Sequence, residues 1–217
     1  MQTIKIDIVS DVVCPWCYLG KARLERALAA IKNVTAEINW RPYQLDPTIP
    51  RGGVDRKQYM EAKFGAGPRL GEIHKQLEGF GREVGIRYAF DDIKVAPNTL
   101  DAHRLIRWAA QAGSGVQGKV VDRLFRLYFT EGADIGNHAV LVKAGADSGM
   151  DKAIIEALLP TDAEEAGVIG EIATAKQIGI SGVPCFIFNQ KFAVSGAQTP
   201  DVLIEAMQSA IRDSPPA

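Results

Sequence analysis

The chain has 217 residues and a formal net charge of −1. This balance gives no electrostatic basis for binding nucleic acid or an acidic membrane surface. The sequence contains no apolar run of about 18 residues, the length that predicts a membrane-spanning helix. The length fits one domain with a large insertion, or two small domains.

The three cysteines are an odd number, which argues against the disulfide framework of a secreted protein. The first residues lack the basic and then apolar regions of a signal peptide, and a predicted strand begins at once. We therefore expect a cytoplasmic location. In a reducing compartment, a bare pair of thiols is more typical of catalysis or redox sensing than of structural bridging.

The most informative motif lies between a predicted strand and a predicted helix. Residues 4–8 alternate apolar and charged side chains, which indicates a strand, and apolar residues at helical spacing over 24–31 indicate a helix. Cys14-Pro15-Trp16-Cys17 separates these two segments. A C-x-x-C pair in this position is typical of thioredoxin-like redox chemistry.

The motif can be placed on the helix. Pro15 suits the first helical position, which makes Cys14 the expected N-cap residue. The unpaired N–H groups and the positive end of the helix dipole there stabilise a thiolate. Cys17 lies seven residues before Leu24, on the apolar face. We predict an exposed Cys14 and a sheltered Cys17, the asymmetry that thiol–disulfide exchange requires.

A second strand is predicted at residues 36–41, where the alternation returns and stops at Pro42. Strand, helix and strand at this spacing form a βαβ unit, so the two strands are predicted to be parallel. No strand pattern follows for over a hundred residues. Helical spacing there predicts helices at residues 55–64, 70–84, 98–113, 120–128, 137–149 and 151–159.

The C-terminal part returns to strands. A capping box at residues 161–164 predicts a helix that ends near Gly179. Residues 182–188 and 191–194 predict two antiparallel strands, and a last helix is predicted from Thr199. Because the strands lie at both ends, the simplest packing joins them in one sheet with the helical block folded over it.

Segments spread over nearly the whole chain resemble the DsbA-like thioredoxin superfamily, and its FrnE-like branch in particular. They are Ser10–Gly20, Trp40-Arg41-Pro42, Leu45-Asp46-Pro47, Asn98–His103 and Gly182-Val183-Pro184.

The resemblance implies an α/β, thioredoxin-like fold with a large α-helical insertion. It implies a discontinuous thioredoxin-like domain from residues 1–45 and 178–217, with residues 46–177 as an inserted helical domain. It also implies that Cys14 is the nucleophile and Cys17 the resolving thiol of a thiol–disulfide oxidoreductase.

The resemblance further implies a cis bond between Val183 and Pro184 that faces the dithiol, with the Val183 backbone pairing with an extended substrate. Pro15 and Trp16, with Trp16 expected at the surface, and Asn98 complete the predicted substrate-binding residues. The expected substrates are thiols or disulfides of proteins or small molecules. The exchange needs no cofactor, although glutathione would serve as a thiol co-substrate.

Two other functions stay open at this point. The superfamily includes 2-hydroxychromene-2-carboxylate isomerases and kappa-class glutathione transferases, which are similar in layout but carry Ser at the position of Cys14. This likeness suggests a glutathione site near Cys14, Asn98 and Val183, and an isomerase or transferase activity. The third function is a redox-responsive binding protein, with a homodimer formed through the helical layer.

The remaining candidates have simpler interpretations. A structural zinc site needs four ligands, so we predict no metal at the dithiol. Cys185 is either a small buried apolar residue or a third thiol that competes for the pair. Asp11 either tunes a thiol or bonds its own backbone. Histidines at positions 74, 103 and 138 have unrelated spacings and are expected to be ordinary surface or partly buried residues.

Overall fold

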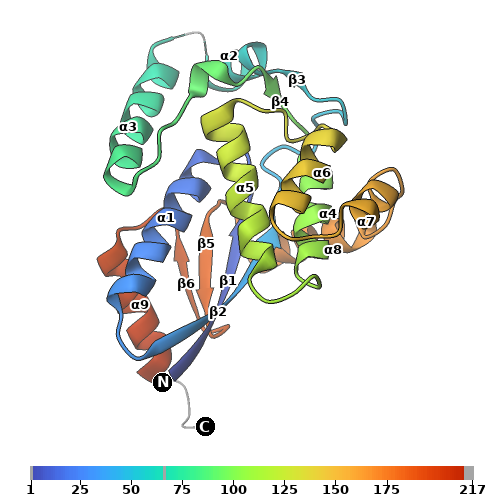
Figure 1. Cartoon of the computed structure of the whole chain (residues 1–217). Coiled ribbons are helices and arrows are strands. Elements are labelled where there is room, and N and C mark those ends of the chain that lie inside the picture. The colour runs from blue at the N-terminus through green and yellow to red at the C-terminus, as the bar shows by residue number, and fades with distance from the viewer. Residues whose placement is uncertain (1, 66, 213–217) are drawn as a thin grey trace.

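The structure is a computed structural model that describes residues 2–65 and 67–212. Its main sheet has four strands in the order β2-β1-β5-β6 (Figure 1). Strand β1 pairs in parallel with β2 and antiparallel with β5, and β5 pairs antiparallel with β6. The strands are β1 (Gln2–Ser10), β2 (Val34–Pro42), β5 (Cys185–Phe188) and β6 (Phe192–Ser195). Both chain ends therefore build one sheet, as predicted.

The middle of the chain is mainly helical (Figure 1). Among the described residues the helices are α1 (Pro15–Ala30), α2 (Arg56–Phe64), α3 (Arg69–Val84), α4 (Leu100–Ala109), α5 (Val116–Glu131), α6 (His138–Asp147), α7 (Lys152–Leu158), α8 (Glu165–Gln177) and α9 (Pro200–Arg212). The expectation of a middle without strands is wrong. Two-residue strands β3 (Val54–Asp55) and β4 (Val95–Ala96) pair there, too short to show an alternating pattern.

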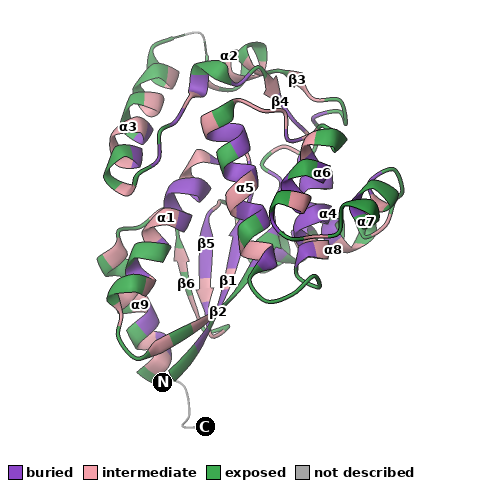
Figure 2. Ribbon diagram, viewed as in Figure 1, coloured by how far each residue is buried: buried purple, intermediate pink, exposed green. Residues whose placement is uncertain are grey.

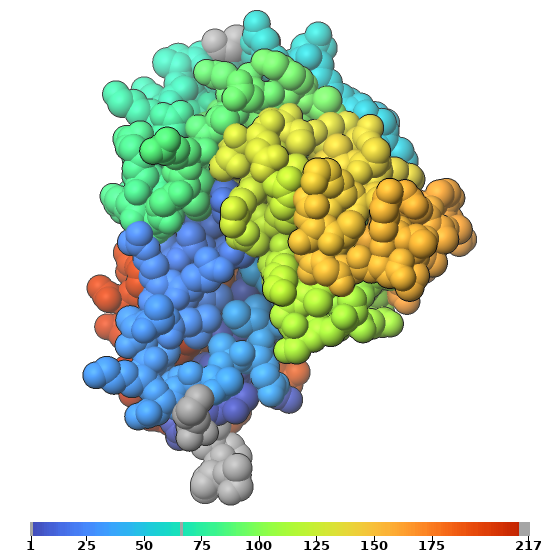
Figure 3. All heavy atoms as spheres, viewed as in Figure 1, coloured from blue at the N-terminus to red at the C-terminus, as the bar shows by residue number. Residues whose placement is uncertain are grey.

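One buried apolar cluster joins the sheet to the helices (Figure 2). It contains Ile4, Ile6 and Ile8 of β1, which are at most 1% exposed, together with Phe125 and Phe129 of α5. Helix α3 also packs on α1, where the green segment meets the blue one (Figure 3). The domain boundaries drawn from the family resemblance remain a prediction.

Two details of the helices differ from prediction. Helix α4 ends at Ala109, earlier than expected. The capping box at residues 161–164 does not form, because the Glu164 carboxylate pairs with Arg107 and Glu164 itself takes a φ of 64°. The Thr161 hydroxyl donates to the Leu158 carbonyl and accepts from the Ala163 N–H, two residues on. A long-range ion pair thus replaces the local capping contact, and α8 begins at Glu165.

Candidate active site

Helix α1 begins at the motif as the sequence predicts. Cys14 is the N-cap residue, with extended φ and ψ of −91° and 113°, and Pro15 occupies the first helical position. The Cys14 N–H donates to the Asp11 carbonyl at 3.0 Å, and the Cys17 N–H donates to the Cys14 carbonyl at 3.0 Å. These bonds fix the two cysteines at the junction of β1 and α1.

The fold brings residue 183 to the motif. The Val183–Pro184 bond is cis, as the family resemblance implies, and the Cys14 thiol donates to the Val183 carbonyl at 3.7 Å. Helix α1 reaches this position because Gly20 has no side chain. A Cβ at Gly20 would lie 3.0 Å from Pro184 Cγ and 3.1 Å from Phe186 Cζ.

Both thiols are covered. Cys17 is 1% exposed, which confirms its predicted burial, but Cys14 is only 3% exposed and the prediction of an exposed thiol is wrong. Trp16 is half-buried rather than at the surface, because its ring packs on Phe80 of α3 with centroids 6.3 Å apart. Helix α3 packs on α1 near its start, which the local sequence of α1 does not reveal.

Burial separates the two cysteines chemically. Desolvation raises the pKa of the Cys17 thiol well above its usual value, and the neighbouring Cys14 thiol raises it further. Cys17 is therefore protonated at neutral pH until a reaction step demands its proton. Within the described part of the chain all three cysteines are free thiols.

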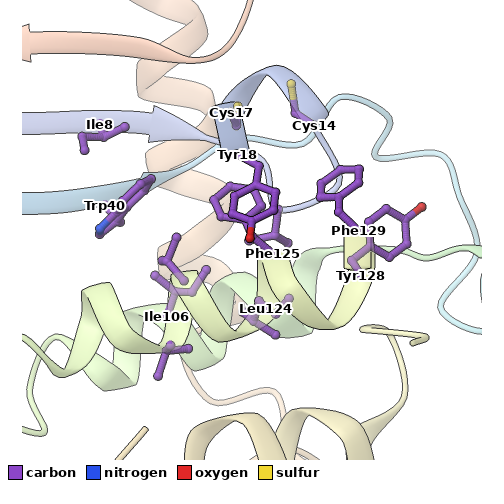
Figure 4. Close-up of a cluster of buried hydrophobic side chains, with 14 of the residues drawn as sticks. Ile8, Cys14, Cys17, Tyr18, Trp40, Ile106, Leu124, Phe125, Tyr128 and Phe129 are labelled. Carbon is purple, nitrogen blue, oxygen red and sulfur yellow. The ribbon is translucent and has the colours of Figure 1, made fainter. Parts of the chain in front are cut away.

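Aromatic side chains contact the first residues of α1, at and directly after the motif. The Tyr18 ring stacks on Phe125 at 5.1 Å and on Phe129 at 6.0 Å (Figure 4). The Tyr88 hydroxyl donates to the Pro15 carbonyl at 2.8 Å. Burial raises the pKa of Tyr18 to about 12, so its hydroxyl is neutral at physiological pH. The start of α1 is thus held by rigid, uncharged contacts.

A cavity of about 340 Å³ opens beside Cys14, and we name it the front cavity. Its volume lies in the range of small-molecule sites. Val13, Ile49, Phe64, Ile73 and Phe129 are among its apolar walls. The polar side chains at its border are Asp11, Asp46, Arg56, Tyr59, Lys63, His74, Thr99 and Tyr128. An apolar group attached to a sulfur atom would fit here against the Cys14 thiol.

Most of the predicted binding residues meet at this cavity. Pro15, Trp16 and Val183 line it together with Cys14, and Pro184 is buried directly behind Val183. The walls that α2 and α3 contribute were not predicted from the sequence. Residues such as Phe64 carry no signal that distinguishes a cavity wall from ordinary packing.

Asn98 is not among the residues that line the front cavity. Its side-chain oxygen accepts from the Gln44 amide at 3.2 Å and from the Leu100 N–H at 2.9 Å, and its Nδ2 donates to the Ile49 carbonyl at 2.6 Å. Asn98 therefore ties a loop of the cavity wall to the start of α4. Direct binding of substrate by Asn98 stays a prediction.

The Asp11 carboxylate bonds neither a thiol nor its own backbone, the two contacts considered from the sequence. Its carboxylate is 1% exposed, and Oδ2 accepts from the Leu45 N–H at 2.8 Å. Oδ1 lies 3.4 Å from Nε2 of His103, a buried imidazole that also donates to the Tyr43 carbonyl at 2.8 Å. Asp11 thus anchors the loop after β2, and His103 is buried rather than partly exposed.

The other two histidines lie apart from the dithiol. The His74 ring stacks on Phe90 with centroids 4.0 Å apart, and burial lowers its pKa. His138 is exposed and pairs with Asp101 at 3.1 Å. Among the residues that the structure describes, His, Cys, Asp and Glu side chains form no group of three that would ligate a metal.

Cys185 faces away from the dithiol. It lies opposite Val9 in the sheet and packs with Val9, Tyr43 and Ala175. Its neighbour Phe186 points to the other side, into the cluster that contains Cys14 and Cys17. Because consecutive strand residues point to opposite faces, the sheet separates Cys185 from the motif, and Cys185 acts as a small buried side chain.

Replacement of Cys185 by Ala is therefore expected to leave formation of the Cys14–Cys17 disulfide unchanged. The cost should appear in folding, where loss of a buried sulfur lowers the free energy of unfolding by about 1 kcal/mol. Thiol counting after oxidation, with peptide mapping of the bridge, checks this. A bridge from Cys14 to Cys185 in the unsubstituted chain would contradict the placement.

None of the helices in residues 2–65 and 67–212 combines the length and apolar character needed to cross a membrane.

Comparison with known proteins extends the likeness along the chain. The uncharacterized protein YwbO of Bacillus subtilis (strain 168) is 27% identical over 212 residues, which cover 95% of this chain and 96% of that protein. A probable DsbA oxidoreductase of Streptomyces coelicolor is 29% identical, with a TM-score of 0.88 over 99% of this chain and 92% of that one.

Two more distant solved structures share the fold. A 2-hydroxychromene-2-carboxylate isomerase is 18% identical, with a TM-score of 0.68 over 96% of each chain. The cytosolic disulfide reductase DsbM of Pseudomonas aeruginosa, also solved with glutathione, is 19% identical, with a TM-score of 0.65 over 97% of this chain and 100% of that one.

The family model of the DSBA-like thioredoxin domain matches residues 5–208. This match covers both strand-forming ends and the helices between them, and it agrees with the cis Val183–Pro184 bond beside the motif. The chain therefore belongs to the family of DSBA-like thioredoxin domains.

Proposed function

We propose that this protein is a thiol–disulfide oxidoreductase that exchanges disulfides through Cys14 and Cys17. The observation that carries the proposal is the contact of the Cys14 thiol with the Val183 carbonyl at 3.7 Å, at the wall of the front cavity. This arrangement places an incoming sulfur between a nucleophile at a helix start and the Val183 carbonyl. We expect the exchange to take place in the cytoplasm.

The reaction has two steps. The Cys14 thiolate attacks a substrate disulfide, so a mixed disulfide forms and the first substrate thiolate leaves. Cys17 then loses its proton and attacks Cys14 Sγ, which releases the second substrate thiolate and leaves a Cys14–Cys17 disulfide. The protein loses two electrons and the substrate gains them. Oxidation of a substrate dithiol runs the same steps in reverse, and glutathione is a suitable thiol to recycle the pair.

The front cavity indicates which kind of chemical group lies next to the sulfur of the substrate. The walls of the front cavity are mainly apolar, while Arg56, Lys63 and His74 lie at its border. We expect disulfides with an apolar or aromatic neighbour to react faster than fully polar ones. Protein disulfides are suitable if such a side chain accompanies the cysteine.

Equilibration in glutathione redox buffers tests the proposal. The expected result is a Cys14–Cys17 disulfide that forms and disappears at one defined potential, detected by thiol trapping and mass spectrometry, together with catalysed reduction of insulin. Failure of the two cysteines to form any disulfide would overturn the proposal. Disulfide formation without turnover, with affinity for a partner that depends on oxidation, would instead indicate the redox-responsive binding protein.

A glutathione-dependent isomerase or transferase is the second candidate. The front cavity favours it, because a space of about 340 Å³ beside a thiol accommodates a small organic substrate. This function needs bound glutathione and one catalytic position, whereas disulfide exchange needs both thiols. Activity that survives Cys17→Ser but disappears without glutathione would support the isomerase or transferase.

A further inference from the structure

The proposed exchange requires a group that takes the proton from Cys17, and the residues described so far do not supply one. Cys17 must release a proton before it attacks the mixed disulfide, yet burial raises the pKa of its thiol. The groups that face it are the Cys14 thiol, the Tyr88 hydroxyl and the residues at the end of β1. The Tyr88 hydroxyl already donates to the Pro15 carbonyl. Neither Cys14, in its disulfide, nor Tyr88 can therefore assist the thiolate.

Ser10, the last residue of β1, has an unused hydroxyl. It is 4% exposed, and its Oγ has no hydrogen-bond partner among the described protein atoms. Cys17 lies just beyond the end of this strand (Figure 4). Residues 4, 6, 8 and 10 of β1 share one face of the sheet, so the Ser10 side chain leaves the strand toward the buried cluster that contains Ile8 and Cys17. Ser10 and the Asp11 backbone both act to lower the pKa of the Cys17 thiol, against the larger effect of burial. An unpaired buried hydroxyl costs free energy in the folded state, and a catalytic role or a bound water is an explanation for keeping one.

A second cavity, the rear cavity, lies behind Ser10. Its volume is about 170 Å³, enough for several water molecules. Ser10 lines it together with Trp40, Gln117 and Ala110. The titratable or charged side chains that also line it are Arg41, His103, Arg107 and Glu171. Cys14, Val183 and the other walls of the front cavity do not border it. Cys17 does not line the rear cavity, so Ser10 is the residue that connects this cavity to the end of β1 next to the resolving thiol.

We propose that Ser10 is a positioning residue for the resolving step. Its hydroxyl donates a hydrogen bond to the Cys17 thiolate, and water in the rear cavity accepts the thiol proton through that hydroxyl. The Asp11 carboxylate is directed elsewhere, since it bonds the Leu45 N–H and faces His103. This inference rests on the proposed exchange function. It assigns a route, through the Ser10 hydroxyl to water, to the proton that Cys17 must release in the second step.

The two steps can be followed separately with dithiobis(nitrobenzoate). Attack by Cys14 releases one coloured nitrothiobenzoate, and attack by Cys17 on the mixed disulfide releases a second one. In stopped-flow absorbance, Ser10→Ala is expected to leave the first phase unchanged and to slow the second about tenfold, the effect of losing one hydrogen bond to a charged group. The pH at half-maximal rate of the second phase should move upward.

Two variants control for a structural effect. Ser10→Thr keeps a hydroxyl and should restore the second phase. Ser148→Ala removes another buried hydroxyl, one that bonds the Ala144 carbonyl in α6, and should affect neither phase. An unchanged first phase in Ser10→Ala shows that the motif is still folded. Equal second phases in Ser10→Ala and the unsubstituted chain would overturn the role of Ser10.

The water route has its own variant. Ala110 is exposed at the end of α4 and borders the rear cavity. The substitution Ala110→Phe therefore fills the cavity without placing a larger side chain in the hydrophobic core. We expect a slower second phase with an unchanged first phase. A normal second phase would overturn the route through the rear cavity. Absence of the second phase from the unsubstituted chain would instead refute the proposed exchange function.

Discussion

Cys14→Ser is expected to abolish disulfide exchange completely, whereas Cys17→Ser is expected to keep the first step and stop at the mixed disulfide. A serine hydroxyl remains protonated at neutral pH and cannot form the sulfur–sulfur bond on which the exchange depends. The difference between the variants follows from position. Cys14 borders the front cavity and contacts the Val183 carbonyl, whereas Cys17 is buried behind it.

Mass spectrometry after reaction with oxidised glutathione distinguishes these outcomes. The Cys17→Ser protein should carry one glutathione at Cys14, and the Cys14→Ser protein should carry none, because Cys14 lines the front cavity and Cys17 does not. Cys185→Ala is the matched control, since Cys185 is also a buried thiol but lies on the other face of the sheet. Rapid modification of Cys17 in the Cys14→Ser variant would contradict the assignment of nucleophile and resolving thiol.

Arg104→Met is expected to lower the free energy of unfolding by about 3–5 kcal/mol, as the loss of one partner in a buried ionic network does. The Arg104 guanidinium is 1% exposed. It pairs with the Asp101 carboxylate at 2.7 Å and donates to backbone carbonyls after α7. These acceptors are Leu158, Leu159, Thr161 and Ala163.

The methionine side chain is long and apolar, so the lost volume is small. The main cost is the set of buried carbonyls and the Asp101 carboxylate, which lose a donor. Burial alone raises the pKa of Asp101, but hydrogen bonds from Arg104 and His138 outweigh this and leave the pKa below its usual value. Asp101 therefore stays ionised at neutral pH and needs its cationic partners.

Urea unfolding followed by circular dichroism measures this loss. Arg107→Met is the matched control, one turn later on α4, where the guanidinium is half-exposed and pairs with Glu164 and Glu171. That variant should lose no more than about 1 kcal/mol, the value of exposed ion pairs. Arg104→Lys should lie between the two, because an ammonium group reaches fewer acceptors than the planar guanidinium. Similar losses in Arg104→Met and Arg107→Met would contradict the anchoring role.

Features that depend on contacts between neighbouring residues were predicted from the sequence, whereas features that depend on contacts between distant residues were not. The alternation in β1, the helical spacing in α1 and the N-cap at Cys14 depend on neighbouring residues, and all three were predicted. The Asp55 cap of α2 and the hairpin of β5 and β6 are likewise local. In contrast, the capping box at residues 161–164 was predicted wrongly because the distant Arg107 binds Glu164.

Burial of the site depends on contacts across the chain. Cys14 was expected to be exposed because helix starts usually are, but α3 and the Val183 segment cover it. Asn98 lies in a segment suited to binding, yet its amide is used within the protein. Each of these differences involves a partner more than 40 residues away. The periodicity of apolar residues in the sequence cannot identify such partners.

The sequence by itself determined the chemistry of this protein: two thiols at a strand-to-helix junction, with Cys14 at the helix start and Cys17 on the apolar face. These features follow from backbone geometry over a few residues. Only the tertiary structure decided the surroundings, namely the front cavity, the contact with Val183, the isolation of Cys185 and the unpaired Ser10 hydroxyl. These depend on how the inserted helices pack on the sheet, a balance of contacts between distant segments.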